Sequence, residues 1–481
     1  MRAVFNRKRR YMFLDQDLFD YLEDKVEWNN KLHPNGKLNL KLDVVVFLVD
    51  LITIKQGLER SKTNKGFAKI CAKILKQYHH NYNTHIDFLL KNRVLKRKPY
   101  DAKKGKCFAY KLVWKPPFKK KWAQRKMKAY TPQDFTFAKR INNDELKAKD
   151  FANGRCRHLT KWLDSDINIA YEDSLQYLDH EEMNGNQKYQ RRHAIERIHQ
   201  GYWVYSRNGK DDRLHSNLVN LPSDLRQFIT YKGQILCSLD FKSSQPFILA
   251  GILNLCVNGS YDLLDSLIEM ISDRKLAESL SSTLAVMIPK ISETPMNTDI
   301  RAFINLVVTG DIYNYLGQQY SIEFLSTITT KNGTIVDRFF DESIDKKVDK
   351  QFDDLRGYSK VVMLEYLYCS PKSNEKRLNE VRRILPDCIN KFVDLMKGEN
   401  KADFPILLQN IEAALFLDTL TKELSEKYQD MFMATIHDSI VVPINYQTEV
   451  HEFMRKRTFE IFEIVPEVKY EIWGKNISLV A

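Results

Sequence analysis

The chain has 481 residues, of which 43% are apolar and 11% aromatic, so it can bury a large core divided between two or three globular domains. Its 75 Lys and Arg residues exceed its 62 Asp and Glu residues, and the net charge of +13 favours a polyanionic partner, most often nucleic acid. Seven scattered cysteines without a CxxC pair argue against a disulfide framework or a zinc ribbon, and no apolar run is long enough to span a bilayer. We therefore expect a cytoplasmic protein without a membrane partner.

The N-terminal region is predicted to form three helices followed by a basic hairpin. Apolar residues recur at helical spacing over residues 42–56 and 67–78, and a third helix is expected from residue 83. Two strand-like runs in residues 96–114 then flank a lysine-rich turn. This order resembles a winged-helix domain, which we place at residues 1–116.

The winged-helix resemblance implies contact with DNA at two places. The third helix would enter a groove of the duplex. The lysines of the turn would lie along the phosphates, and these are Lys103, Lys104 and Lys106. Two alternatives stay open, because the same pattern fits a small helical domain with a solvated basic loop and a winged helix that binds protein.

A basic linker and two mainly helical regions follow this domain. We place the linker at residues 117–135, where lysines and arginines follow a pair of prolines. Residues 130–230 and 262–400 are expected to be largely helical, whereas residues 400–481 alternate a helix with strands. No internal repeat or low-complexity tract interrupts this order.

Two aspartates stand at the ends of predicted strands. Asp240 closes an apolar run and precedes a helix with Pro246 in its first turn, and Asp438 lies between the strand-like runs 431–436 and 440–444. If these strands are neighbours in one sheet, the two carboxylates converge and offer the hard oxygen ligands that Mg²⁺ prefers. Two such ions would lower the pKa of an attacking hydroxyl and neutralise a departing pyrophosphate. The alternative is an ordinary hairpin turn, in which aspartate is a favoured residue.

A third segment, RGYSKVVMLEYLYCSPKS, is predicted to form a helix with functional groups along one face. Arg356, Lys360, Leu364 and Tyr368 follow one another at four-residue steps and so share that face. Such a face presents cations to a triphosphate at one end and an aromatic ring to a base at the other. The alternative is an exposed amphipathic helix with an ordinary core stripe.

Taken in order, these three segments resemble motifs A, B and C of the A-family DNA polymerases and of their relatives, the phage-type single-subunit RNA polymerases. In that family the motif A aspartate ends a strand, motif B reads R-x3-K with a tyrosine eight residues after the lysine, and motif C is a histidine and an aspartate at a hairpin tip. The matching residues here are Asp240, Arg356, Lys360, Tyr368, His437 and Asp438. The resemblance covers roughly residues 200–481.

Weaker matches fill the intervals and imply contacts with nucleic acid. DRLHSNLVNLPSDLRQFI is similar to the stretch before motif A, which implies that Arg213 touches the minor groove. GDIYNYL is similar to the helix before motif B, and LQNIEAALFL to the helix before motif C, where Gln409 would contact the template. By the same resemblance His437 would touch the primer terminus.

The fold that this resemblance implies is a right-hand polymerase of the α/β (α+β) class with an antiparallel palm sheet. The palm would comprise residues 213–262 and 400–481, the helical fingers residues 263–399, and a reduced thumb residues 136–212. Asp240 and Asp438 would bind two Mg²⁺ ions, with Mn²⁺ as a substitute.

Further ligands and substrate contacts follow from the same resemblance. The Phe241 carbonyl would be a further ligand of the metal ions. Arg356 and Lys360 would hold the nucleotide phosphates, and Tyr368 would stack at the nascent base pair. Each of these roles rests on the match of the motifs.

Three departures bear on the choice of sugar. The family's DNA enzymes usually carry glutamate five residues after the motif A aspartate, where this chain has Gln245, which has a similar volume and can accept a hydrogen bond from Tyr368. Leu364 replaces an aromatic residue common in the DNA enzymes, and HDS replaces HDE. The bulk of Gln245 and the Arg213 stretch favour DNA synthesis.

We therefore predict a DNA-directed DNA polymerase that uses a DNA template, a primer and dNTPs. Proofreading is not expected, because an exonuclease domain does not fit in the remaining N-terminal length. One alternative is an RNA polymerase or primase of a mobile element or phage, which would use NTPs. An alternative of another class is a DNA-binding replication initiator without catalytic activity.

Overall fold

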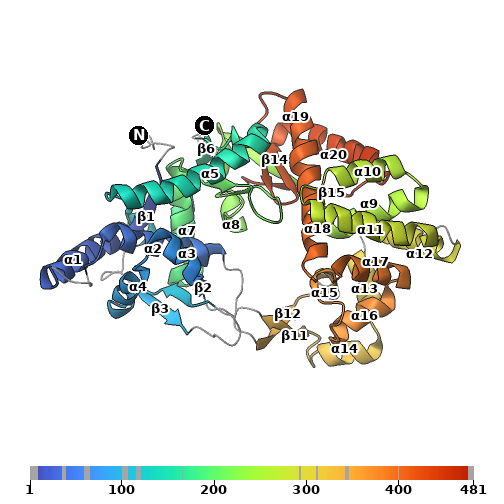
Figure 1. The fold of residues 1–481 in the computed structure, drawn as a ribbon, viewed down its shortest axis with the longest axis horizontal. Coiled ribbons are helices and arrows are strands. Elements are labelled where there is room, and N and C mark those ends of the chain that lie inside the picture. Colours follow the sequence, from blue (N-terminus) through green and yellow to red (C-terminus); the bar gives the residue numbers. More distant parts are fainter. Residues whose placement is uncertain are drawn as a thin grey trace.

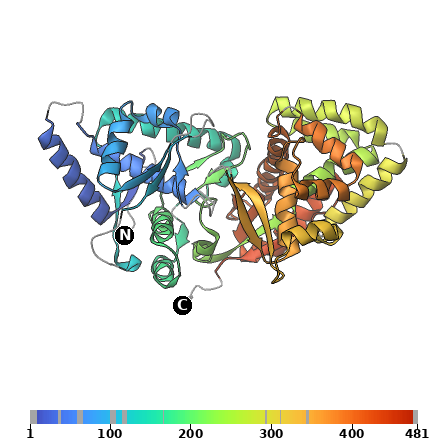
Figure 2. The same cartoon turned by 90° about the horizontal axis from the view of Figure 1, so that it is seen from below.

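The computed structural model describes residues 9–34, 39–58, 66–99, 107–114, 121–164, 166–291, 294–309, 312–341, 346–398 and 400–474. Within these ranges many helices pack against small antiparallel sheets, which makes the structure mixed α/β. Figures 1 and 2 show two lobes, one built from the N-terminal elements and the other from α9 onward. None of the described helices is both long and apolar enough to cross a lipid bilayer. All seven cysteines are free thiols.

The N-terminal lobe is built around helix α2, which packs against α1, α4 and α7. Its strands form a sheet in the order β2-β4-β3 and a separate pair, β1 with β5. The elements up to β5 are β1 (Met12–Asp15), α1 (Gln16–Leu32), α2 (Leu42–Leu58), β2 (Ala68–Lys69), α3 (Ala72–Tyr78), α4 (Tyr82–Lys91), β3 (Leu95–Lys98), β4 (Ala109–Leu112), the 3₁₀ turn η3 (Trp122–Gln124) and β5 (Met127–Tyr130).

The predicted helix over residues 67–78 is partly wrong, because its first residues form strand β2 and α3 begins only at Ala72. The backbone N–H of Ile70 donates to the Phe108 carbonyl at 3.1 Å, so this stretch continues the pairing with β4. A partner strand distant in sequence here overrides a helical spacing of apolar residues. The resulting order is helix, strand, helix, helix and hairpin.

The middle of the chain was predicted to be mostly helical, and it also contains short strands. Strands β6 and β9 extend the central sheet, and their three-residue length leaves little periodicity to detect. Helix α5 reaches from α3 in the N-terminal lobe to β13 and α19 in the other lobe. The elements are α5 (Phe135–Thr160), β6 (Ile167–Ile169), α6 (Tyr171–His180), α7 (Gly185–His199), β7 (Tyr205–Ser206), β8 (His215–Ser216), α8 (Ser223–Arg226) and β9 (Ile229–Tyr231).

A six-stranded antiparallel sheet joins the two lobes and is centred on β10 (Gln234–Phe241). Strand β10 pairs with β14 (Ser439–Pro443) along one edge and with β15 (Val468–Ile472) along the other. The remaining order is β13-β14-β10-β9-β6, with β13 at Ala434–Ile436. The apolar run of β10 therefore lies between strands from the last part of the described chain.

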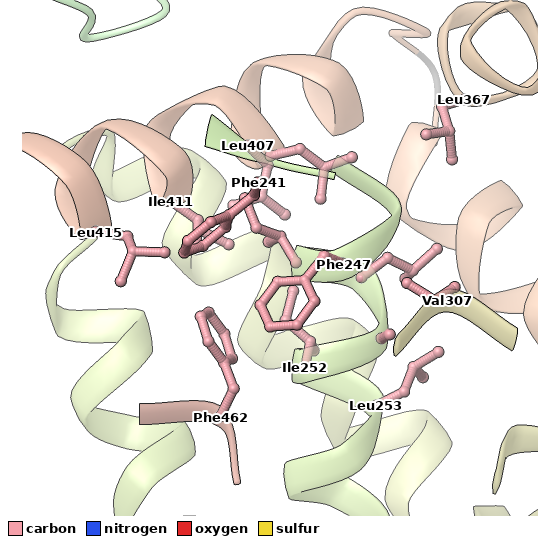
Figure 3. Close-up of a cluster of buried hydrophobic side chains, with 14 of the residues drawn as sticks. Phe241, Phe247, Ile252, Leu253, Val307, Leu367, Leu407, Ile411, Leu415 and Phe462 are labelled. Atoms are coloured by element: carbon pink, nitrogen blue, oxygen red, sulfur yellow. The ribbon is translucent and has the colours of Figure 1, made fainter. Parts of the chain in front are cut away.

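The face of β10 that carries Phe241 packs against a helical core. Helix α9 (Ser244–Asn258) is apolar on all sides and fully covered over most of its length, as a helix at the centre of a core must be. Figure 3 shows Phe241 and Phe247 beside Ile411 and Phe462 of neighbouring helices. The rings of Phe241 and Phe247 lie 5.5 Å apart. This core fixes the position of β10 and of the residues on its other face.

The remaining helices form the second lobe together with one hairpin that the sequence did not predict. Strands β11 (Ile335–Asp341) and β12 (Lys346–Phe352) lack a clear alternation, because Asp337 shares a face with the buried Ile335 and Phe339, while Phe340 is exposed on the other face. The other elements are α10 (Tyr261–Glu269), α11 (Arg274–Ile291), α12 (Thr294–Val308), α13 (Ile312–Gln319), α14 (Ile322–Ile328), α15 (Leu355–Tyr368), α16 (Lys376–Ile384), α17 (Asp387–Lys397), α18 (Asp403–Ala413), the π-helical segment η4 (Ala414–Leu420), α19 (Thr421–Lys427), the 3₁₀ turn η5 (Ile444–Tyr446) and α20 (Gln447–Phe462).

Candidate active site

The pairing of β10 with β14 brings the two aspartates together. Asp240 lies directly opposite Ser439, the residue after Asp438. Strands β13 and β14 are joined by a two-residue turn of His437 and Asp438, and His437 has a φ of 55°, a left-handed conformation that is uncommon for a non-glycine residue. The prediction that both acids meet at one place in one sheet is therefore confirmed.

Both carboxyl groups are costly to ionise in the folded protein. Burial and the charge of Asp438 together raise the pKa of Asp240 to about 6, although the charges of Lys469 and Lys360 oppose this effect. Burial likewise raises the pKa of Asp438, against the charges of Arg213 and Lys360. Two acids that are costly to ionise side by side are suited to binding cations.

Helix α15 presents the predicted face toward the two acids. Its opposite side is buried in the core through Tyr358, Ser359, Val362, Met363, Tyr366 and Leu367. Lys360 influences both aspartates, as described above, and the guanidinium of Arg356 lies 5.8 Å from the ring centre of the buried Tyr313. Leu364 and Tyr368 continue the less buried side toward the C-terminal end of the helix.

A hydrogen bond links the start of α9 to the end of α15. The Tyr368 hydroxyl oxygen lies 2.7 Å from Nε2 and 2.9 Å from Oε1 of the Gln245 amide. The hydroxyl donates to Oε1, which is the contact that the sequence suggested for glutamine at this position. Gln409 of α18 lies 3.5 Å from the same hydroxyl. Three residues expected to touch the nucleotide or the template thus meet at Tyr368.

The structure places Arg213 in a partly buried ion pair that the sequence did not predict. Its Nη2 donates to Glu412 of α18 at 2.5 Å, and the Ser244 hydroxyl donates to the other carboxylate oxygen of Glu412 at 3.2 Å. Burial raises the pKa of Glu412, with the Arg213 charge opposing and the Asp438 charge adding to the effect. Glu412 stands three residues after Gln409, so both lie on the same side of one helix. This spacing is the sequence signal that could have identified Glu412 as a site residue.

The other predicted site residues are divided between the site and regions beyond it. Phe241 follows Asp240, and its side chain lies in the core, with its ring 4.8 Å from that of Phe416. His437 forms the turn beside Asp438. The loop lysines Lys103, Lys104 and Lys106 lie outside the described residues. Their contact with DNA stays a prediction.

The carboxylate oxygens of the two aspartates are suitable ligands for a cation. Neither carboxylate takes part in an ion pair or a hydrogen bond with another side chain of the described residues, so their lone pairs remain for ligation. In the same part of the chain, no group of three or more His, Cys, Asp or Glu side chains is arranged to hold a metal ion. A metal ion at Asp240 and Asp438 would therefore need further ligands from a backbone carbonyl, water or a bound phosphate.

Comparisons with known proteins add a weak structural similarity. No family model matches the chain, and neither does any curated protein. Among solved structures, the chain is similar to the POL domain of Pol1 from M. smegmatis in complex with DNA primer-template and dNTP, at 13% sequence identity and a TM-score of 0.24. The similarity covers 63% of this chain and 50% of that chain, so this chain spans about half the length of that polymerase structure.

Proposed function

We propose that the chain is a template-directed nucleic-acid polymerase, and specifically a DNA-directed DNA polymerase that acts by two-metal nucleotidyl transfer without proofreading. The observation that supports this most strongly is the register that sets Asp240 opposite Ser439 and thus beside Asp438. Lys360 of α15 faces both acids and supplies the cation that a triphosphate needs.

The proposed reaction is in-line attack of a primer 3′-hydroxyl on the α-phosphorus of a bound nucleotide. The new bond joins the primer oxygen to phosphorus, and pyrophosphate leaves. Arg356 and Lys360 hold the phosphates and neutralise charge on the leaving group. Mg²⁺ ions, held by Asp240, Asp438 and the Phe241 carbonyl, would supply Lewis-acid stabilisation when bound.

The choice of deoxyribose is proposed to depend on Gln245. Its amide is fixed by the Tyr368 hydroxyl and is nine-tenths buried, so it cannot easily move away from a ribose 2′-hydroxyl. A side chain held in this way excludes the larger sugar by its volume, although it lacks the charge of glutamate. This contact supports dNTPs over NTPs as substrates.

The subdomains follow the same proposal. Residues 213–262 and 400–481 would form the palm, residues 263–399 the fingers and residues 136–212 a reduced thumb. The N-terminal residues 1–116 would form a winged-helix module that grips DNA. Pairing of β2 with β4 beside the β3–β4 hairpin supports this last assignment, because a winged helix requires that strand arrangement.

Primer extension tests the proposed function directly. Purified protein is incubated with a primed DNA template, Mg²⁺ or Mn²⁺, and either dNTPs or NTPs. We expect extension with dNTPs, lowered by at least about 10²-fold in Asp438→Ala. Glu467→Gln is a matched control, because this acid belongs to an exposed ion pair with Lys242 at 2.8 Å.

Two results would assign a different function. A clear preference for NTPs would identify an RNA polymerase or primase. Equal inactivity of the wild type and Asp438→Ala, with DNA binding retained in both, would identify a DNA-binding initiator without catalytic activity. Removal of a mismatched primer end in the absence of nucleotides would contradict the proposed lack of proofreading.

A further inference from the structure

A cavity apart from the candidate active site lies between the N-terminal lobe and the segment that leads to the central sheet. It has a volume of about 380 Å³ and is enclosed by α2, α5, α7 and the β7–β8 hairpin. None of the predicted site residues lines it. Its volume falls within the range of roughly 300–1,000 Å³ that is usual for small-molecule sites.

The wall of this cavity contains a buried cluster of charges that do not balance. Arg10 lies 3.8 Å from Asp50 and 4.0 Å from Glu145, and Lys149 pairs with Glu145 at 2.7 Å. Arg197 belongs to the same cluster, because its charge acts on Asp50. Three cations thus share two carboxylates. Burial of such an excess of charge is costly unless an anion compensates it.

Other groups hydrogen-bond to both oxygens of Glu145 and to one oxygen of Asp50, whereas Asp50 Oδ2 is buried without a hydrogen bond, 3.8 Å from Arg10. Asp50 accepts from the Phe13 backbone N–H at 3.1 Å and contacts the His193 ring at 2.9 Å. Glu145 accepts from the Tyr202 hydroxyl at 2.9 Å as well as from its lysine partner. Within the part of the chain that the structure describes, neither carboxylate forms a hydrogen bond with Arg197.

Arg197 is the cation without a polar partner. Its residue is 8% exposed, and its guanidinium lies 6.0 Å from the ring centre of Phe13 and 5.2 Å from that of Tyr202. The Nε atom is buried without a hydrogen-bond acceptor. Within the described residues the guanidinium forms neither a hydrogen bond nor an ion pair, although the side chain lines the cavity. The guanidinium N–H groups of Arg197 that reach the cavity are thus available to a ligand.

We propose that this cavity binds a phosphate ester of mononucleotide size, with the phosphate on Arg197. The planar donors of a guanidinium match phosphate oxygens better than they match most other anions. Tyr78 and Tyr205 line the same cavity and offer aromatic surfaces to a base. Asp144 lies on the exposed rim, where solvent screens its charge.

Two sources supply this chemistry, a free nucleotide and a phosphate at the end of a DNA strand. Binding is measured by calorimetry in EDTA, which keeps divalent ions from the two catalytic acids. The probes are AMP, adenosine, and a short oligonucleotide with or without a 5′-phosphate. We expect AMP or the phosphorylated strand to bind, whereas adenosine and the unphosphorylated strand bind at least about tenfold more weakly.

Three variants locate the binding. Arg197→Gln should weaken it by at least about tenfold, and so should Ala148→Phe, which fills the cavity without changing the charged residues. Lys360→Ala should leave it unchanged, because that lysine faces the other site. Circular dichroism shows whether each variant is folded. If Arg197→Gln does not fold, the binding measured with Ala148→Phe decides the test.

The tighter of the two phosphate probes identifies the source. Binding of neither probe would overturn the proposal. So would equal affinity for adenosine and AMP, or binding that survives in folded Ala148→Phe. Because the assay does not measure synthesis, its outcome is independent of whether the chain is a polymerase.

Discussion

Replacing Asp240 by asparagine is expected to stabilise the fold while removing activity. Its pKa is raised from the ordinary 3.8 to about 6 by burial and by Asp438, so the ionised carboxylate is costly in the folded state. This difference corresponds to about 3 kcal/mol at neutral pH, and solvent screening at this partly exposed group reduces it to about 1–2 kcal/mol. Asparagine has a similar shape without the charge, so the melting temperature should rise by a few degrees.

The pH dependence has a definite sign. Because the folded-state pKa lies above the unfolded value, the unfolded chain loses its proton first as the pH rises. The wild type therefore loses stability between about pH 4 and pH 6, and Asp240→Asn should lose less, because only Asp438 and Glu412 still carry raised pKa values at the site. Thermal melting followed at several pH values should show similar stabilities near pH 4 and a more stable variant above about pH 6.

An acid in the opposite situation provides the control. Burial by itself would raise the pKa of Asp50, but the hydrogen bond from His193 and the charges of His193, Arg197 and Arg10 lower it. Asp50→Asn should therefore destabilise the protein at neutral pH. A lower melting temperature for Asp240→Asn above pH 6, or a difference from the wild type that does not change with pH, would refute the reasoning.

Three more outcomes are expected. Gln245→Ala removes the hydrogen bond to Tyr368 and the bulk beside it, so incorporation of NTPs relative to dNTPs should rise by about tenfold or more in single-nucleotide assays, and an unchanged ratio would exclude a role in sugar choice. Glu412→Ala leaves Arg213 without its carboxylate partner, so denaturant titration should show that the free energy of unfolding falls by about 3–5 kcal/mol, whereas it should fall less in Glu412→Gln. Gly251→Ala should cost about 1–3 kcal/mol, because a Cβ would meet the Phe462 ring, and unaltered stability would show that this ring can move.

The meeting of the two acids can be predicted from the sequence because each stands at a position that ends a strand or turns a hairpin. The apolar runs before and after Asp240 and Asp438 set the strand boundaries, and only the adjacency of β10 and β14 remains to be assumed. The face of α15 that carries Arg356, Lys360 and Tyr368 is similarly predictable, because four-residue spacing determines which side chains share a helix face.

Features that depend on a partner distant in sequence could not be predicted. Strand β2 is two residues long and exists because β4 pairs with it. The Arg213–Glu412 ion pair joins residues 199 positions apart, and no local pattern marks Arg213 as paired. The unbalanced charges beside Arg197 come from four separate segments, so the imbalance emerges only when those segments pack.

The position of β10 between β14 and β15 has a consequence for synthesis on the ribosome. Both flanking strands, Ser439–Pro443 and Val468–Ile472, leave the ribosome long after Gln234–Phe241 has emerged. Until then this apolar strand pairs only with β9, at Gln234 and Ile235, and the open edges along the rest of its length invite association with other chains. The protein must therefore delay or shield this strand during translation, and a nascent chain that stops before Val468 should be prone to aggregate.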